Sequence, residues 1–551
     1  MRRLRIAAVL AVGMALAVSQ WATAAPGATR ATPRSHFSPL ALESLHLKQK
    51  AQSADLNPGD SASQIQCKTN NASGAANLKL DCDTILPNNE PDIAVNPADP
   101  MNMVGSSNDY DQCCDAFYTT FNGGKTWYVG DMSVEAPGQN KRTGSDPVTT
   151  FDVKNGTVIH SSLNFLNDAC DGDVVASISQ DGGKKWNTVV QVADAGGPSQ
   201  CEDDGLFNDK EWITTDNNPE SDHYGTSYLV WTAFLSSAGH VLESPIWEAH
   251  STDGGFNWST PQEISGSNAS LCTYQEDGPA SECDEDQFGV PTVGPDGTVY
   301  VSYVNEQNEG LWESGEVFDD QFLLVKSSNG GGTWSDPVQI AGLEDGSRDF
   351  PINVNGRQTL SNQQMRVSSS AGVVADPTLN GRLYFVFSDN RNGTHDVDDP
   401  VTNTDVFIVS SVNGGDTWTA PAQVNPADEG AGNDQYYPWV DVNPVDGTVG
   451  VLFFDRSYTT HFRPHGTTLA ESPAGGAAFA QHEVTTAPSH TRNSVFFRAF
   501  APGCKRCTRF EGDYNNIEYG SDGSVNMVWT DMRDLYAPLG RYLQFIYFAR
   551  E

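Results

Sequence analysis

Apolar and aromatic residues recur along the chain in short paired segments separated by turn residues. Seven segments follow one plan: a strand, a turn rich in Pro, Asp, Asn and Gly, and a second strand rich in Val, Tyr, Phe and Trp. The segments begin at Pro91, Pro147, Lys210, Val290, Arg366, Tyr437 and Asn515. Repetition of one two-stranded unit predicts an all-β chain built from similar sheets.

A recurring nine-residue turn sequence follows the first five pairs. Aligned on a final Trp, the copies share Ser or Thr seven residues earlier, Asp or Asn five earlier, and a Gly pair between. The Asx side chain can accept hydrogen bonds from N–H groups of its own turn, and the two glycines can take positive φ. The pattern therefore predicts a tight hairpin. The copies end at Trp127, Trp186, Trp258, Trp334 and Trp418.

Two inner strands followed by a third strand, this turn and a fourth strand make a four-stranded propeller blade. Seven inner pairs favour seven blades, with six blades plus an irregular closing sheet as the alternative. The unit at Tyr437 lacks the turn sequence, so residues 461–490 are expected to form a long loop or distorted outer hairpin. The last unit supplies only three strands, and we expect a strand within Ala76–Asp83 to complete it.

The turn sequence resembles the Asp-box, or BNR repeat, of the sialidase superfamily. In the copy "SSVNGGDTW" the box residues are Ser411, Asn413, Gly415, Thr417 and Trp418. The resemblance covers roughly residue 85 to the C-terminus and implies a β-propeller, although the chain is not a close match to true sialidases. Because Asp-boxes occur in sialidases, other glycosidases, lyases, assembly factors and receptors, the box implies the fold more than the reaction.

The N-terminus has the features of a secretory signal. Three arginines precede an apolar run and then Ala22-Thr23-Ala24. We therefore expect residues 1–24 to be a signal peptide, 25–60 a linker or pro-segment, and 61–551 the Asp-box propeller, with a retained N-terminal anchor as the alternative. The expected location is secreted, either extracellular or periplasmic.

Ten cysteines in an exported chain favour disulfides. The local pairings that the spacing allows are Cys67–Cys82, Cys170–Cys201, Cys272–Cys283 and Cys504–Cys507, which leaves Cys113 and Cys114. For the last of these pairs, within "CKRC", the alternative to a disulfide is a metal or redox site.

The chain carries 71 acidic and 32 basic residues, for a net charge of −39. Such a field repels nucleic acid and anionic membranes, so neither is an expected partner. We expect a monomer that binds a glycan or polysaccharide and does not insert into a membrane after signal cleavage. No cofactor is predicted to be required. The acidic loops at 168–173, 275–287 and 395–405 either hold calcium as a structural ion or are solvated surface charge.

Strand alternation places the start of each first strand and the end of each second strand at one end of the propeller, near its axis. Charged residues concentrate at these positions, and we expect no metal ion among them. The catalytic candidates are Asp209, Tyr514, Glu511 and Asp92. The substrate-binding candidates are Arg391, Arg456, Arg533, Lys210, Asp389, Asp455 and Asp531.

The resemblance implies specific roles, because sialidases use an arginine triad for the carboxylate of their sugar. Arg391, Arg456 and Arg533 would form that triad, since guanidinium groups bind carboxylates with two parallel hydrogen bonds. Tyr514 or a nearby carboxylate such as Glu511 would be the nucleophile. Asp209 or Asp92 would be the acid/base. The alternative is that the Asp/Arg pairs clamp neighbouring blades.

Three functions remain open from the sequence. The favoured one is a glycan-active hydrolase that uses paired carboxylates on an acidic sugar or polysaccharide. The second is a noncatalytic propeller that binds glycan or protein. The third is a polysaccharide lyase, in which Lys210, Tyr514 or a His would handle the proton. A reducing sugar without an unsaturated product distinguishes the first from the third.

Overall fold

The computed structural model describes residues 76–551 apart from a series of short gaps. The proposed signal peptide, the 25–60 segment and all cysteines except Cys272 and Cys283 lie outside the described residues. The gaps are 82–86, 111–114, 140–142, 166–171, 196–203, 238–239, 274–280, 307–319, 345–349, 351–357, 362–364, 368–371, 397–398, 427–431, 460–463, 477, 492–509 and 539.

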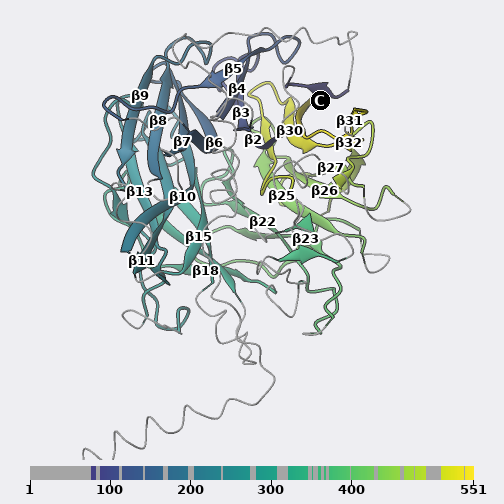
Figure 1. The fold of residues 1–551 in the computed structure, drawn as a ribbon. Helices are drawn as coiled ribbons and strands as arrows, with labels where there is room; N and C mark the ends of the chain where they lie inside the picture. Colours follow the sequence, from purple (N-terminus) through teal and green to yellow (C-terminus); the bar gives the residue numbers. More distant parts are fainter. Residues whose placement is uncertain are drawn as a thin grey trace, which may run out of the picture. The chain divides into compact units, whose positions relative to one another are not determined.

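Seven antiparallel sheets, six of four strands and one of five, form the blades of the described chain (Figure 1). Blade one is β2 (Asn88–Val95), β3 (Met103–Asp109), β4 (Asp115–Thr120) and β5 (Tyr128–Met132). Blade two is β6 (Thr143–Asp152), β7 (Thr157–Phe165), β8 (Asp173–Ser179) and β9 (Thr188–Ala193). Blade three is β10 (Asp204–Thr215), β11 (Ser227–Ser237), β13 (Ile246–Ser251) and β14 (Gln262–Glu263), with β12 (His240–Glu243) beside β11.

The later blades repeat the plan. Blade four is β15 (Asp286–Val293), β16 (Val299–Asn305), β17 (Gln321–Ser327) and β18 (Val338–Gly342). Blade five is β21 (Gly372–Ala375), β22 (Leu383–Asp389), β23 (Asp405–Ser411) and β24 (Ala422–Gln423). Blade six is β25 (Gln435–Val442), β26 (Val449–Asp455), β27 (Gly466–Ser472) and β28 (Ala480–Glu483). Blade seven is β29 (Asn516–Tyr519), β30 (Val525–Asp531), β33 (Phe545–Arg550) and β1 (Leu78–Lys79). Two small hairpins lie outside the blades: β19 (Thr359–Leu360) with β20 (Met365–Arg366), and β31 (Leu535–Tyr536) with β32 (Arg541–Tyr542).

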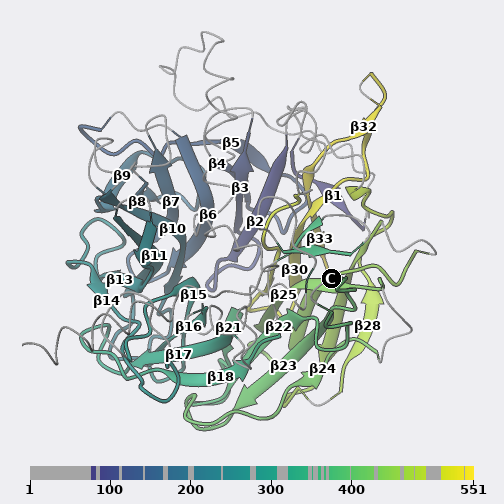
Figure 2. The same cartoon turned by 60° about the horizontal axis from the view of Figure 1, so that its bottom comes forward.

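The first strand of each blade lies beside the first strand of the next. The contacts run from β2 to β6, β10, β15, β21, β25 and β29, and β29 returns to β2, so the seven inner strands surround an axis (Figure 2). The seven-bladed prediction is confirmed, and the six-bladed alternative is wrong.

The ring closes with the predicted N-terminal strand. β1 pairs with the C-terminal strand β33, with Leu78 opposite Phe548. Asp81 then anchors the segment, because its carboxylate accepts hydrogen bonds from Asn88 Nδ2 at 3.0 Å, from Tyr118 Oη and from Ile546 N. The outer edge that blade seven would otherwise expose is thereby paired.

The five Asp-box turns have the predicted geometry. In the box of blade five, Ser411 Oγ accepts the N–H of Gly415 at 3.0 Å, and Asn413 Oδ1 accepts the N–H of Thr417 at 3.1 Å. Gly414 and Gly415 have φ of 68° and 81°. Trp418 Nε1 donates to Gly415 O at 3.1 Å. All five turns join the third and fourth strands of their blades, as predicted.

The expectation for the sixth unit was wrong. Instead of a long loop or distorted hairpin, β27 and β28 form a regular antiparallel pair, with Leu469 opposite His482. Gly475 and Gly476, at φ of 111° and 63°, supply the positive φ that the Asp-box glycines supply elsewhere. A hairpin therefore forms here from a different turn sequence.

One expected disulfide lies within the described residues and is confirmed. Cys272 and Cys283 are bonded on the connection between blades three and four. No helix among the described residues is long and apolar enough to cross a membrane.

Candidate functional site

The inner strands of five blades carry a β-bulge at the same position. At each bulge the register with the second strand shifts, and one non-glycine residue takes a left-handed conformation. Bulges redirect side chains, and left-handed residues that carry a Cβ are strained, so both features mark this position as unusual. The five residues are Glu90 (φ 56°), Asp146 (59°), Lys210 (53°), Phe288 (55°) and Tyr437 (53°).

Glu90 is held in a buried position near blade seven. It is 1% exposed, and its carboxylate accepts Asn108 Nδ2 at 2.7 Å and the N–H of Asp513 at 3.0 Å. Gly512 permits this approach, because a Cβ there would lie 2.9 Å from Glu90 Cγ. Burial, and then the charges of Asp146 and Asp513, raises the pKa of Glu90 well above its usual range.

Arg366, on β20, was missed by the sequence reasoning. Its Nη2 donates to Asp513 Oδ2 at 2.6 Å, and its backbone carbonyl accepts Tyr437 Oη at 3.1 Å. The guanidinium also lies 4.9 Å from the ring centroid of Phe510. No local pattern marks this arginine, because its partners come from blades six and seven.

Lys210 lies against aromatic rings beside several acids. It is 7% exposed, and its Nζ lies 3.8 Å from the ring centroid of Tyr514 and 4.1 Å from that of Trp212. Among the described residues this Nζ has no hydrogen-bond partner. Burial lowers the pKa of Lys210, against the opposing effect of Asp146 and Glu90. Burial also raises the pKa of the adjacent Glu211.

These residues form what we call the axial cluster. Its members couple electrostatically to one another across blades one, two, three and seven and β20. Within it the structure brings together two predicted site residues, Lys210 and Tyr514. The axial cluster consists of Glu90, Asp146, Lys210, Glu211, Arg366, Asp513 and Tyr514.

An aromatic layer and a channel adjoin the cluster along the axis. Trp212 stacks on Trp439 with ring centroids 4.5 Å apart, and Tyr514 meets Trp212 edge-on at 5.2 Å. Both tryptophans also line a cavity of about 380 Å³ bounded by the inner strands of all seven blades, which we call the central channel. The layer therefore separates the charged cluster from most of the channel.

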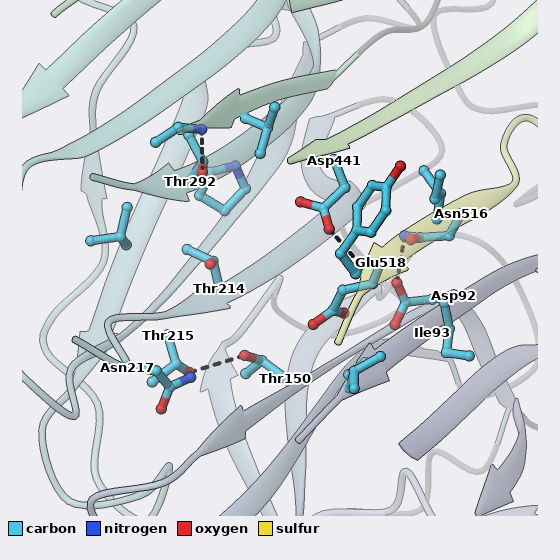
Figure 3. Close-up of a pocket in the computed structure, with 18 of the residues that line it drawn as sticks. Asp92, Ile93, Thr150, Thr214, Thr215, Asn217, Thr292, Asp441, Asn516 and Glu518 are labelled. Atoms are coloured by element: carbon cyan, nitrogen blue, oxygen red, sulfur yellow. Dashed lines mark hydrogen bonds between the residues drawn. The ribbon is translucent and has the colours of Figure 1, made fainter. Parts of the chain in front are cut away.

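Asp92 lines the central channel (Figure 3). Its carboxylate accepts the N–H of Thr149, on blade two, at 2.7 Å and Asn516 Nδ2, on blade seven, at 2.8 Å. Burial raises its pKa to about 7. Asp92, the predicted acid/base, therefore links blades one, two and seven. It follows the bulge that contains Glu90.

The three predicted arginines have separate partners. Arg391 Nε donates to both oxygens of Asp389 at 2.8 and 3.0 Å, and Arg533 Nη2 donates to Asp531 Oδ2 at 2.6 Å. Arg391 also reaches a carbonyl on β18 of blade four, and Arg533 reaches residue 77 near β1. These contacts fit the clamp alternative for both arginines.

Arg456 pairs with Asp434 and not with the preceding residue in the chain, Asp455. Arg456 is fully buried, and its Nη1 donates to Asp434 at 2.8 Å. Asp455 instead accepts hydrogen bonds from Gln435 Nε2 and Thr468 Oγ1, each at 3.0 Å. Asp434 precedes the inner strand β25, and Asp455 is the last residue of β26.

The remaining predicted residues, Glu511 and Asp209, are also buried. Glu511 accepts Tyr436 Oη at 2.8 Å and pairs with His465 Nε2 at 2.8 Å, all three being buried. Asp209 is buried on β10 opposite Thr232. Among the described residues, no group of His, Cys, Asp and Glu is arranged to hold a metal ion.

No protein-family model and no curated protein matches the sequence. Solved structures resemble the fold at low identity. A Hadza microbial sialidase is 16% identical, with a TM-score of 0.39. The match covers 66% of this chain and 63% of the sialidase, so this chain spans less than two thirds of that protein's length. The NanB sialidase of Streptococcus pneumoniae is 7% identical over 82% of this chain and 83% of the sialidase, with a TM-score of 0.43. An α-L-arabinofuranosidase of Fusarium graminearum is 12% identical over 76% of this chain and 97% of the arabinofuranosidase, with a TM-score of 0.41. At these identities the likeness concerns the fold alone.

Proposed function

We propose that the protein is a glycoside hydrolase whose reaction takes place at the axial cluster. The observation that carries the proposal is the convergence of acidic side chains from strained backbone positions at one end of the axis. A non-glycine residue in the left-handed region costs on the order of 1–3 kcal/mol, and such strain is concentrated at functional sites. Five such residues at one level of the inner strands support a site there.

Glu90 and Asp513, which are linked by the Asp513 backbone N–H, carry carboxyl groups that suit different roles. Burial raises the pKa of Glu90 and so favours its protonated form, which makes it the group suited to donate a proton to the glycosidic oxygen. Asp513 forms an ion pair with Arg366 at 2.6 Å, and an opposite charge stabilises a carboxylate. Asp513 is therefore the proposed base or nucleophile. Separation of two carboxyl groups by environment is what glycoside hydrolysis requires.

The cations of the cluster favour an acidic sugar or polysaccharide as substrate. Lys210 Nζ, without a hydrogen-bond partner among the described residues, can donate to a carboxylate of the sugar. Arg366 contributes a second positive charge beside Asp513. Side chains of the chain itself fill all the proposed roles, without a cofactor.

A substrate panel with matched variants tests the proposal. Acidic oligosaccharides and polysaccharides are incubated with the purified protein, and reducing ends and unsaturated products are measured separately. We expect reducing ends without unsaturated product, and a loss of about 10²-fold or more in Glu90→Gln and Asp513→Asn. Glu518→Gln, a channel carboxyl outside the axial cluster, is the matched control and should retain activity. An unsaturated product would indicate a lyase.

A noncatalytic glycan-binding propeller is the second candidate. The observation that favours it is the burial of the cluster, in which Glu90, Asp146 and Glu211 are each at most 3% exposed. Binding of an acidic glycan that is reduced by Lys210→Ala, with no product from any substrate, would replace the hydrolase proposal with this one.

Secretion is part of the proposal. The disulfide between Cys272 and Cys283 supports an oxidising compartment, where such bonds persist. N-terminal sequencing of the exported protein should begin just after Ala24. A mature protein that still begins at Met1 would contradict the signal cleavage.

A further inference from the structure

The end of the axis opposite the axial cluster, which we call the basal face, carries exposed apolar residues. It consists of the turns between first and second strands and the turns between third and fourth strands. Of the eight large hydrophobic residues exposed among the described residues, five lie on these turns. We call these five the basal crescent: Leu379, Val412, Val445, Met101 and Phe121.

The crescent residues of blades five and six lie on adjoining turns. Val412 and Val445 are 65% and 62% exposed, and Leu379 is 44% exposed. The two turns of blade five are joined by a hydrogen bond from Gly414 N to Gly381 O at 2.8 Å. A Cβ on Gly447, in the turn that carries Val445, would lie 3.3 Å from Thr378 Oγ1. Leu379, Val412 and Val445 therefore lie on adjoining turns of two neighbouring blades.

The central channel reaches the basal face beside these turns. Its lining includes exposed residues of the turns between first and second strands, namely Pro97, Pro377, Pro444 and Ser521. Farther along the axis the channel wall carries Asp92, Asp441 and Glu518, which Figure 3 shows near one another. None of the described residues that line the channel is Lys, Arg or His. An apolar surface thus borders the mouth of an acidic channel.

Holding these acids without a cation is costly for the protein. Burial raises the pKa of Asp441 to about 7, and burial followed by the charge of Asp441 raises the pKa of Glu518. Asp441 Oδ2 accepts the N–H of Tyr519 at 2.7 Å, and hydrogen bonds from the backbone of Tyr519 and Val442 only partly offset the effect of burial on its pKa. A cation placed in the channel would offset the repulsion between these carboxyl groups.

We infer that the basal face binds a polypeptide partner that places one Lys or Arg side chain in the central channel and apolar side chains on the basal crescent. Charge complementarity identifies the occupant, because the channel offers three acidic side chains and no base, and a bound cation favours the ionised form of those acids. The aliphatic stem of Lys or Arg suits the apolar parts of the wall, such as Val95 and Val442. A second copy of this chain is disfavoured by a net charge of −39, which makes two copies repel.

Peptide selection tests the inference on the full-length protein. A displayed library of random twelve-residue peptides is selected on the wild-type protein, and the enriched peptides are synthesised for titration by fluorescence polarisation. We expect a basic residue flanked by apolar residues in the enriched peptides. Replacing that basic residue by norleucine should weaken binding about tenfold or more.

Two variants and one control locate the binding site. Glu518→Gln removes a carboxyl group that a bound cation would ionise, and Val445→Ser removes an exposed crescent side chain. Each variant should therefore bind the selected peptide about tenfold more weakly. Leu535→Ser, at an exposed position on β31 outside the basal turns, is the matched control and should bind normally. None of these residues belongs to the axial cluster, so failure here leaves the hydrolase proposal standing.

Several results would overturn the inference. No enrichment, enriched peptides without a basic residue, or binding unaffected by both variants would each do so. Dimerisation in sedimentation velocity that Val445→Ser abolishes would assign the crescent to a second copy. Co-sedimentation with phosphatidylcholine vesicles, lost in Val445→Ser and unchanged in Glu518→Gln, would assign it to a membrane.

Discussion

Asp441→Asn is expected to stabilise the protein at pH 8 and to leave its stability at pH 4 nearly unchanged. Asp441 lies on β25 and lines the central channel, and its Oδ2 accepts the N–H of Tyr519, on blade seven, at 2.7 Å. An Asn amide oxygen can accept the same hydrogen bond, so the substitution removes a charge and keeps the contact between the two blades.

The magnitude follows from the pKa of this carboxyl group. Burial raises the pKa of Asp441 from 3.8 to about 7, so the folded protein binds this proton more tightly than the unfolded chain. The free energy of unfolding therefore falls as pH rises between these two values. At about 1.4 kcal/mol per pKa unit the full effect is about 4 kcal/mol. Because the side chain is partly exposed to the channel, solvent screening reduces the expected gain to about 2–4 kcal/mol at pH 8.

Urea unfolding followed by tryptophan fluorescence measures this difference at pH 4, 6 and 8. The gain of Asp441→Asn over wild type should grow with pH. Asp446→Asn, on the exposed turn that follows β25, is the control and should show no such growth. An Asn variant that is less stable than wild type at pH 8, or equally shifted at pH 4 and pH 8, would refute the reasoning.

Three further predictions concern the blades and the cluster. Trp127→Ala should lower the free energy of unfolding by about 3–5 kcal/mol because its ring is fully buried, whereas half-buried Trp418→Ala should cost less; equal losses in urea titrations would contradict this. Gly512→Ala should reduce glycan hydrolysis about 10²-fold by displacing Glu90, and unchanged rates would count against the cluster. Arg456→Lys should lower the free energy of unfolding by about 3 kcal/mol and leave glycan binding unchanged, because it disturbs a fully buried ion pair with Asp434. Unchanged thermal melting together with weaker glycan binding in titrations would disprove this structural role.

The parts of the fold that depend on local sequence could be predicted. Every bond of the Asp-box lies within nine residues, so Ser411, Asn413 and the glycines specify their turn almost alone. The number of blades followed from counting repeats. The closing strand at Leu78–Lys79 was predictable because the final unit lacked one strand.

The site was only partly predictable, because its contacts join distant residues. Lys210 and Tyr514 were found because strand order alone places first strands around one axis. Arg366 and Asp513, 147 residues apart, meet only through the tertiary fold, so their ion pair leaves no local signal. The bulge in β2 was also hidden. Since a bulge shifts the side-chain alternation, it places Glu90 in the cluster and leaves Asp92 in the channel.

Hydrolysis of two glycosides that share a sugar and differ in leaving group tests the catalytic role of the axial cluster most directly. A 2,4-dinitrophenyl leaving group departs without protonation, whereas an ordinary sugar hydroxyl requires a general acid. We predict that Glu90→Gln hydrolyses the dinitrophenyl glycoside at close to the wild-type rate and loses about 10²-fold or more on the natural linkage. Equal losses on both substrates, or no loss on either, would contradict the assignment of Glu90 as the acid at the axial cluster.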